Sequence, residues 1–181
     1  SGTSSNMNAN EVIANLASKN SKLNIGPNDD VNMSQSSNDV IPTAIKISAH
    51  IDLTKKLYPA LDKLINEIEK KAKSLKGITK TGRTHLMDAM PIDFSDELLA
   101  WSSQLSACRN MLEVIEERFL ELPQGGTAVG SGINAHKQFA KFFAQEMSKI
   151  LETKRKYIPS NNFFHELSAQ DCSVPVSYTH L

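Results

Sequence analysis

Residues 94–122, FSDELLAWSSQLSACRNMLEVIEERFLEL, contain the hydrophobic pattern that decides the fold. Apolar residues return at alternating steps of four and three along this stretch, at Phe94, Leu98, Trp101, Leu105, Cys108, Leu112, Ile115, Phe119 and Leu122. Such a seam occupies the a and d positions of a heptad repeat, so it predicts one long helix that packs against other helices at a shallow angle. On this pattern Cys108 is expected to be a small, buried hydrophobe.

Further helices are predicted on both sides of this seam. The stretch 39–77 has Pro42 near its expected start, where a missing N–H costs little, and Pro59 in its middle, where a kink or break is expected. Helical spacing also predicts a helix over 136–153, and 10–17 can form a short one. No alternating pattern of useful length predicts a strand. The sequence therefore predicts an all-α fold, a bundle of long helices preceded by a polar, loop-rich segment.

Composition and charge exclude several classes of protein. The chain has 181 residues, and its 20 Lys and Arg balance its 20 Asp and Glu, so it lacks the basic excess of a nucleic-acid-binding module. No apolar run is long enough to span a membrane. The start carries neither Met nor a signal peptide, and the chain is expected to begin inside a longer protein. Two cysteines without metal-ligand spacing support no metal site and fit a reducing compartment.

The first candidate site is Ser36-Ser37-Asn38-Asp39, just before the helix that contains Pro42. Hydroxyls and a carboxamide at a helix start, together with free backbone N–H groups and the positive end of the helix dipole, can bind an anion. The alternative interpretation is that one of these residues only caps the helix.

The second candidate is His85 in residues 81–91, TGRTHLMDAMP, which lie between two long helices. Histidine suits proton transfer near neutral pH, and Thr84 beside it offers a hydroxyl. The alternative is a loop histidine without chemistry. The glycine-rich segment 125–132 matches no phosphate-binding loop, and a tight turn, or a backbone that a ligand approaches closely, fits it better.

Taken together, these segments resemble the fumarase/aspartase superfamily, and within it most closely the class II fumarate hydratase family. The matching strings are SGTSSNMNANEVIAN, PNDDVNMSQSSND, GRTHLMDAMP and GGTAVGSGINAH, in the family's order and at compatible separations. The resemblance covers residues 1–136 well. It implies that 1–38 is the end of an N-terminal domain and 39–176 is part of a central helical-bundle domain. Residues 177–181 continue no pattern and are expected to be a non-native tail.

The resemblance implies reversible addition of water to fumarate, giving (S)-malate in the tricarboxylic acid cycle, with no metal or organic cofactor. Removal of a proton next to a carboxylate creates an aci-carboxylate, which needs many uncharged donors around its oxygens. His85 matches the family's catalytic histidine. The substrate-binding positions match Ser1, Gly2, Thr3, Ser36, Ser37, Asn38 and Thr84. Asn28 and Asp29 match part of a second dicarboxylate site, but Gly26 stands where the family usually has His.

The resemblance also implies a homotetramer whose active sites are shared between subunits, located in the cytoplasm or, in a eukaryote, the mitochondrial matrix. The family's loop with its serine base is expected to lie beyond this chain, so the fragment alone is expected to be inactive. The alternatives are an aspartate ammonia-lyase, which Ser37 and His85 disfavour, and a non-catalytic helical relative.

Overall fold

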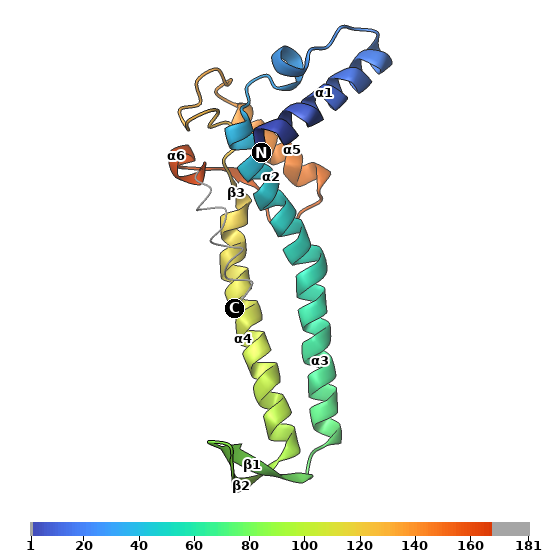
Figure 1. Ribbon diagram of the computed structural model, residues 1–181, viewed down its shortest axis with the longest axis vertical. Coiled ribbons are helices and arrows are strands. Elements are labelled where there is room, and N and C mark those ends of the chain that lie inside the picture. Colours follow the sequence, from blue (N-terminus) through green and yellow to red (C-terminus); the bar gives the residue numbers. More distant parts are fainter. Residues whose placement is uncertain (1, 168–181) are drawn as a thin grey trace. The chain divides into compact units, whose positions relative to one another are not determined.

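The computed structural model describes residues 2–167, which form a mostly helical chain (Figure 1). Ser1, Cys172 and the predicted tail 177–181 lie outside the described residues. The predicted fold class is confirmed. The elements are, in chain order, α1 (Gly2–Ser21), the π-helical turn η1 (Pro27–Val31), α2 (Ser37–Asp52), the π-helical turn η2 (Leu53–Leu57), α3 (Tyr58–Ser74), β1 (Thr79–Thr84), β2 (Met87–Asp93), α4 (Phe94–Leu120), β3 (Glu121–Leu122), α5 (Phe139–Ile150), β4 (Ile158–Pro159) and α6 (Phe163–Glu166).

The chain divides into two compact units, residues 1–50 with 116–181, and residues 51–115. This division differs from the domain boundary at residue 38 that the resemblance implies, and that boundary stays a prediction. None of the described helices is both long and apolar enough to cross a membrane.

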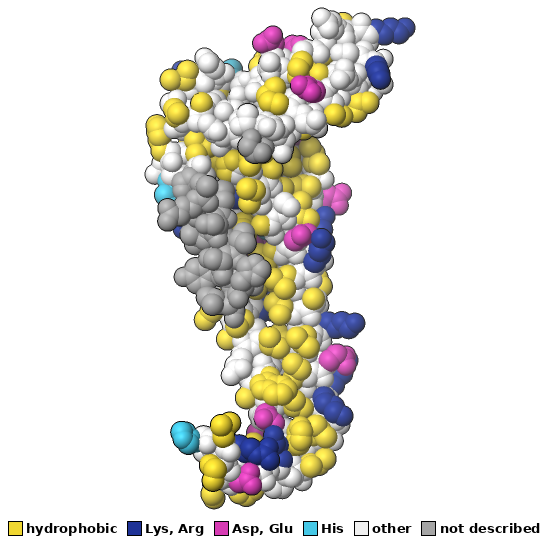
Figure 2. All heavy atoms as spheres, in the orientation of Figure 1, with side chains coloured by type: hydrophobic (Ala, Val, Ile, Leu, Met, Phe, Trp, Pro, Cys, Tyr) yellow, Lys and Arg dark blue, Asp and Glu magenta, His cyan; other side chains and the backbone are white. Residues whose placement is uncertain are grey.

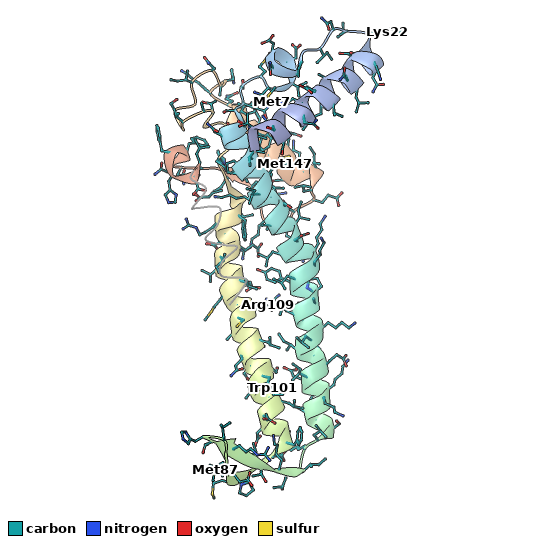
Figure 3. All side chains as sticks on the ribbon, viewed as in Figure 1. Met7, Lys22, Met87, Trp101, Arg109 and Met147 are labelled. Carbon is teal, nitrogen blue, oxygen red and sulfur yellow. The ribbon has the colours of Figure 1, made fainter. Side chains whose placement is uncertain are left out.

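In the unit of residues 51–115, α3 runs beside α4 (Figure 1). Pro59 lies in the first turn of α3, directly after η2. The backbone stays helical at Asp52, Leu57 and Tyr58, so the predicted kink or break corresponds to a change from α-helical to π-helical turns and not to an interruption of the helix. The two helices are joined by polar contacts: Arg109 Nε donates to Asp62 Oδ1 at 2.6 Å, and Ser102 Oγ donates to Glu69 Oε1 at 2.9 Å. Figure 3 labels Arg109 on α4.

The helix predicted from the 94–122 seam is confirmed as α4, but its seam is only partly covered. Leu98 and Leu112 are buried, whereas Trp101 is 50% exposed and Cys108 is also exposed. The prediction that Cys108 is buried was therefore wrong for this chain. The physical reason is that α3 is the one helix of this unit beside α4, and one neighbour cannot cover a whole seam. Figure 2 shows hydrophobic side chains gathered along the two helices.

Residues 79–93 correct the prediction that the chain contains no strand. β1 and β2 form an antiparallel hairpin, with Thr79 opposite Asp93 and Thr84 opposite Met87. Every residue of both strands is exposed or only half-buried. A hairpin without a buried face leaves no alternation of apolar and polar residues, so the sequence pattern could not reveal it.

The other unit surrounds the start of α2. The helix predicted over 136–153 is confirmed as α5, and the short helix predicted over 10–17 extends to the whole of α1. The chain after α4 pairs as a short parallel strand with the chain before α6, joining Leu122 to Pro159. Lys46, fully buried on α2, forms an ion pair with Glu166 and donates to the carbonyl oxygen of Glu121 at 3.1 Å. A buried charge needs such partners, so this pair fixes α6 against α2.

Candidate functional site

The start of α2 is closed by a capping box. Ser36 Oγ accepts from the backbone N–H of Asn38 at 3.2 Å, and the carboxylate of Asp39 accepts from the backbone N–H of Ser36 at 2.9 Å. This pattern satisfies backbone donors that a helix start would otherwise leave open. Ser36 is therefore the helix cap that the alternative interpretation expected of one residue, and it leaves Ser37 and Asn38 for other contacts.

Residues far apart in the sequence meet at this helix start. The hydroxyl oxygens of Thr3 and Ser37 lie 3.2 Å apart, within hydrogen-bond distance. A Cβ on Gly2 would lie 3.0 Å from Cγ1 of Ile41, so glycine allows α1 to approach α2 closely. The contacts surround an open cavity of about 280 Å³, lined by Gly2, Thr3, Ser37, Asn38, Ile41, Pro42, Ile45 and Leu167. The structure thus brings together four of the predicted substrate-binding residues, while Ser1 lies outside the described residues.

The glycine-rich segment lies against the other side of this helix start. Asn38 Nδ2 donates to the carbonyl oxygen of Ala128 at 2.8 Å. The second carboxylate oxygen of Asp39 accepts from the backbone N–H groups of Gly125 at 3.0 Å and Thr127 at 2.9 Å. Burial raises the pKa of Asp39, and these backbone hydrogen bonds oppose the rise. The segment is therefore a turn held by α2, in agreement with the interpretation as a tight turn.

His85 lies at the tip of the β1–β2 hairpin, after Thr84, the last residue of β1. His85 and Leu86 both have positive φ, 50° and 60°, which is the geometry of a type I′ hairpin turn. A bulky residue such as Leu86 rarely adopts this conformation, and strained backbone gathers at functional sites. The His85 side chain is exposed, and among the described residues no hydrogen bond or ion pair holds its ring. Thr84 lines a separate open cavity of about 490 Å³ along the hairpin.

The two groups of predicted site residues belong to different compact units. Gly2, Thr3, Ser37 and Asn38 lie in the unit that contains the start of α2, whereas Thr84 and His85 lie in residues 51–115. Each group is therefore described by itself. No group of three or more His, Cys, Asp and Glu that could hold a metal ion occurs within residues 2–167.

Asn28 and Asp29 lie in η1, and both side chains are exposed. The backbone N–H of Gly26 donates to Asp30 Oδ2 at 2.8 Å, so the neighbouring aspartate organises this turn. A Cβ on Gly26 would meet only that oxygen, at 3.6 Å, which is ordinary contact. The backbone at Gly26 therefore has room for a side chain, and the second dicarboxylate site stays a prediction.

Sequence reasoning missed the buried polar residues around the site. Asp39 belongs to the polar motif at the helix start without a predicted role, although Ser followed three residues later by an acid is a capping-box signal. His50 lies in the last turn of α2, and the sequence indicates no function for it. Its Nδ1 lies 2.7 Å from the Tyr157 hydroxyl and its Nε2 lies 3.3 Å from Glu116. No local signal marks this cluster, because its members come from distant parts of the chain.

The chain is similar to lyases along nearly its whole length. A family described as Lyase matches residues 1–179. The chain is 47% identical over 177 residues to Fumarate hydratase class II 2 of Pseudomonas aeruginosa, which covers 98% of this chain and 38% of that protein. It is 44% identical over 185 residues to the class II fumarate hydratase of Bacillus subtilis, covering 99% of this chain and 39% of that protein. The chain therefore spans about two fifths of the length of these relatives.

Solved structures give the same similarity. A class II fumarase from Schistosoma mansoni superposes with a TM-score of 0.88 and 33% identity, covering 97% of this chain and 41% of that one. A fumarate lyase:delta crystallin from Brucella melitensis, bound to cobalt, gives a TM-score of 0.86 and 38% identity, covering 99% and 39%.

Proposed function

We propose, starting from the fact that this chain belongs to the lyase family, that the full-length protein containing it is a class II fumarate hydratase. The reaction adds water reversibly across the double bond of fumarate and gives (S)-malate. The observation that carries the proposal is the cavity at the start of α2, where Thr3, Ser37 and Asn38 present uncharged polar groups. The similarity to class II fumarate hydratases over 98% of the chain supports it.

The chemistry explains why such a site suits a dicarboxylate. In the direction from malate to fumarate, a base removes a proton from the carbon beside one carboxylate, and negative charge moves onto that carboxylate. Hydroxide then leaves the neighbouring carbon and takes up a proton to become water. Hydroxyl and amide donors aimed at the carboxylate oxygens stabilise the intermediate more than the substrate, which lowers the barrier. The positive end of the α2 dipole adds to the same effect.

His85 is the proposed acid/base residue, with Thr84 beside it as a substrate contact. An imidazole exchanges protons near neutral pH, and a hairpin tip can carry it toward a substrate held elsewhere. The strained backbone at His85 and Leu86 supports a functional role for this turn. We propose Ser1, Gly2 and Ser36 as further parts of the substrate site, and Asn28 and Asp29 as parts of a second dicarboxylate site.

The proposal extends to assembly and location. Exposed apolar residues on α4, among them Leu99, Trp101, Met111 and Val114, support a homotetramer in which other copies cover the open face. Active sites shared between subunits fit the exposed position of His85. A fumarate hydratase of the tricarboxylic acid cycle works in the cytoplasm of a bacterium or in the mitochondrial matrix, and these locations are part of the same proposal.

Substitution of His85 tests this function. In the full-length protein, His85→Asn is expected to lower kcat for malate by about 10²- to 10⁴-fold, the usual contribution of an acid/base residue. The melting temperature should stay within a few degrees, because the side chain is exposed. His136→Asn is the matched control, since His136 is also exposed and lies outside the proposed site. Equal activity of the two variants would contradict the role of His85.

A further inference from the structure

One buried carboxylate joins the proposed substrate-binding segment to the glycine-rich turn. Asp39 is fully buried, and its two oxygens serve different segments. Oδ1 accepts from the backbone N–H of Ser36 at 2.9 Å, whereas Oδ2 accepts from the backbone N–H groups of Gly125 and Thr127 at 3.0 and 2.9 Å. Three backbone donors on one carboxylate fix it in position, because charge-assisted hydrogen bonds are stronger than neutral ones.

Two further hydrogen bonds connect the same segments on either side of Asp39. Asn38 Nδ2 donates to the carbonyl oxygen of Ala128 at 2.8 Å. Before the helix, Gln124 Nε2 donates to Gln35 Oε1 at 3.3 Å. Residues 35–39 and 124–128 are therefore connected at several successive positions, with the Asp39 carboxylate in the middle.

The glycine-rich turn also packs closely against α5. Gly125 has φ of +106°, and a Cβ added there would lie 2.6 Å from the Cβ of Ala140 on α5. The turn thus has little freedom to shift toward α5. Through Asp39, this restraint reaches the start of α2 and fixes the direction in which the helix presents Ser37 and Asn38.

Asp39 acts from the side of α2 that faces away from the cavity. Ser37, Asn38 and Ile41 line the cavity, whereas Asp39 and Thr43 belong to the buried side of the same helix. The Asp39 carboxylate has no place on the cavity wall. Its influence on a ligand must therefore pass through the backbone that it holds.

We propose that Asp39 is a positioning residue for the dicarboxylate site, a role that rests on the proposed function. It fixes the start of α2 against the 125–127 turn, so that Ser37 and Asn38 point at the substrate carboxylate before the substrate arrives. Preorganised donors bind a developing negative charge without reorganising, and small misplacements of such groups cost much of the rate.

The substitution Asp39→Asn in the full-length protein tests this role. An Asn side chain keeps the size but has only one acceptor oxygen, so it cannot accept from both Ser36 and the turn. We expect kcat/KM for malate to fall by about 10- to 100-fold. The dissociation constant of succinate, a saturated dicarboxylate that cannot be hydrated, is expected to rise by roughly 10-fold in calorimetry.

Ile47→Ala is the control, because Ile47 is a buried residue of the same helix that forms no part of the proposed site. It should lower the melting temperature and leave the succinate dissociation constant unchanged. An Asp39→Asn variant that behaves like Ile47→Ala, less stable but with unchanged succinate binding, would overturn the role. Failure of the unmodified protein to turn over malate would instead refute the proposed function, so the two failures are distinguishable.

A second measurement applies if Asp39→Asn does not fold. Hydrogen exchange on the unmodified protein is expected to show strong protection of the Gly125 and Thr127 amides, and saturating succinate should protect them further, because coupling between two sites is reciprocal. The amide of Glu152, which follows α5 and donates to the carbonyl oxygen of Lys149, is the control and should not respond. If succinate leaves the hydrogen exchange of the Gly125 and Thr127 amides unchanged, the proposed role of Asp39 is overturned as well.

Discussion

His50 is a buried histidine whose protonation bears on stability. Its ring is buried on α2, with the Tyr157 hydroxyl 2.7 Å from Nδ1 and Glu116 Oε1 3.3 Å from Nε2. The Glu116 carboxylate can only accept, so neutral His50 carries its proton on Nε2, toward Glu116, and its Nδ1 accepts from the Tyr157 hydroxyl. Burial raises the pKa of Tyr157 to about 12. Burial lowers the pKa of His50, Glu116 opposes this effect, and the charge of Arg155 adds to it.

This lowered pKa predicts a loss of stability in acid. The unfolded chain binds a proton at His50 near the ordinary histidine pKa of 6.5, whereas the folded protein binds it only at lower pH. The contribution of neutral His50 is therefore complete above the ordinary pKa, and falls with pH below it by at most about 1.4 kcal/mol per pH unit. His50→Gln in the full-length protein should reduce this slope, measured by urea unfolding between about pH 5 and 7.5. Identical slopes would contradict the assignment.

For single residues, the sequence could predict which side chains form a polar group, but not which distant residues pack around a buried side chain. Ser36, Ser37 and Asn38 were recognisable as a polar helix start, and the structure places two of them on a cavity. The burial of His50 was not predictable, because its partners lie 66 and 107 residues further along the chain. Long-range partners leave no periodic signal in a single sequence.

At the scale of elements, the turn after α4 depends on one glycine. Gly125→Ala combines a left-handed backbone, φ +106°, with a Cβ that would lie 2.6 Å from the Cβ of Ala140. We expect it to lower the free energy of unfolding by about 3 kcal/mol, from backbone strain and overlap together. Gly77→Ala is the matched control, since φ is +85° there but nothing lies within 4 Å, and it should cost about 1 kcal/mol. Equal losses in denaturant unfolding would show that the contact with α5 does not matter.

The elements themselves were predictable where one face is buried and not elsewhere. The 94–122 seam predicted α4 because apolar side chains recur along one side of the helix. The β1–β2 hairpin escaped prediction because its strands are exposed or half-buried. The glycine-rich segment was recognisable as a turn, but its hydrogen bonds to Asp39 were not, because they join residues 86 and 88 positions apart. Pro59 was informative in its own right: a proline has no N–H to donate to the preceding turn, and the turn before it is π-helical rather than α-helical.

At the scale of the whole molecule, the described chain leaves large apolar side chains exposed. Trp101 is half exposed, and Leu86 beside His85 is fully exposed. The chain spans only 38% of the length of the Pseudomonas aeruginosa relative. The two groups of predicted site residues lie in different compact units, so a single site made of both groups stays a prediction.

The most direct test is a comparison of malate and aspartate as substrates of the purified full-length protein, with fumarate followed by its ultraviolet absorbance. Fumarate is predicted to form from malate and not from aspartate, and residues 1–176 alone, tested in parallel, are predicted to be inactive. Fumarate from aspartate alone would contradict the fumarate hydratase assignment and favour an aspartate ammonia-lyase. No fumarate from either substrate would contradict the account of the site as a catalytic one.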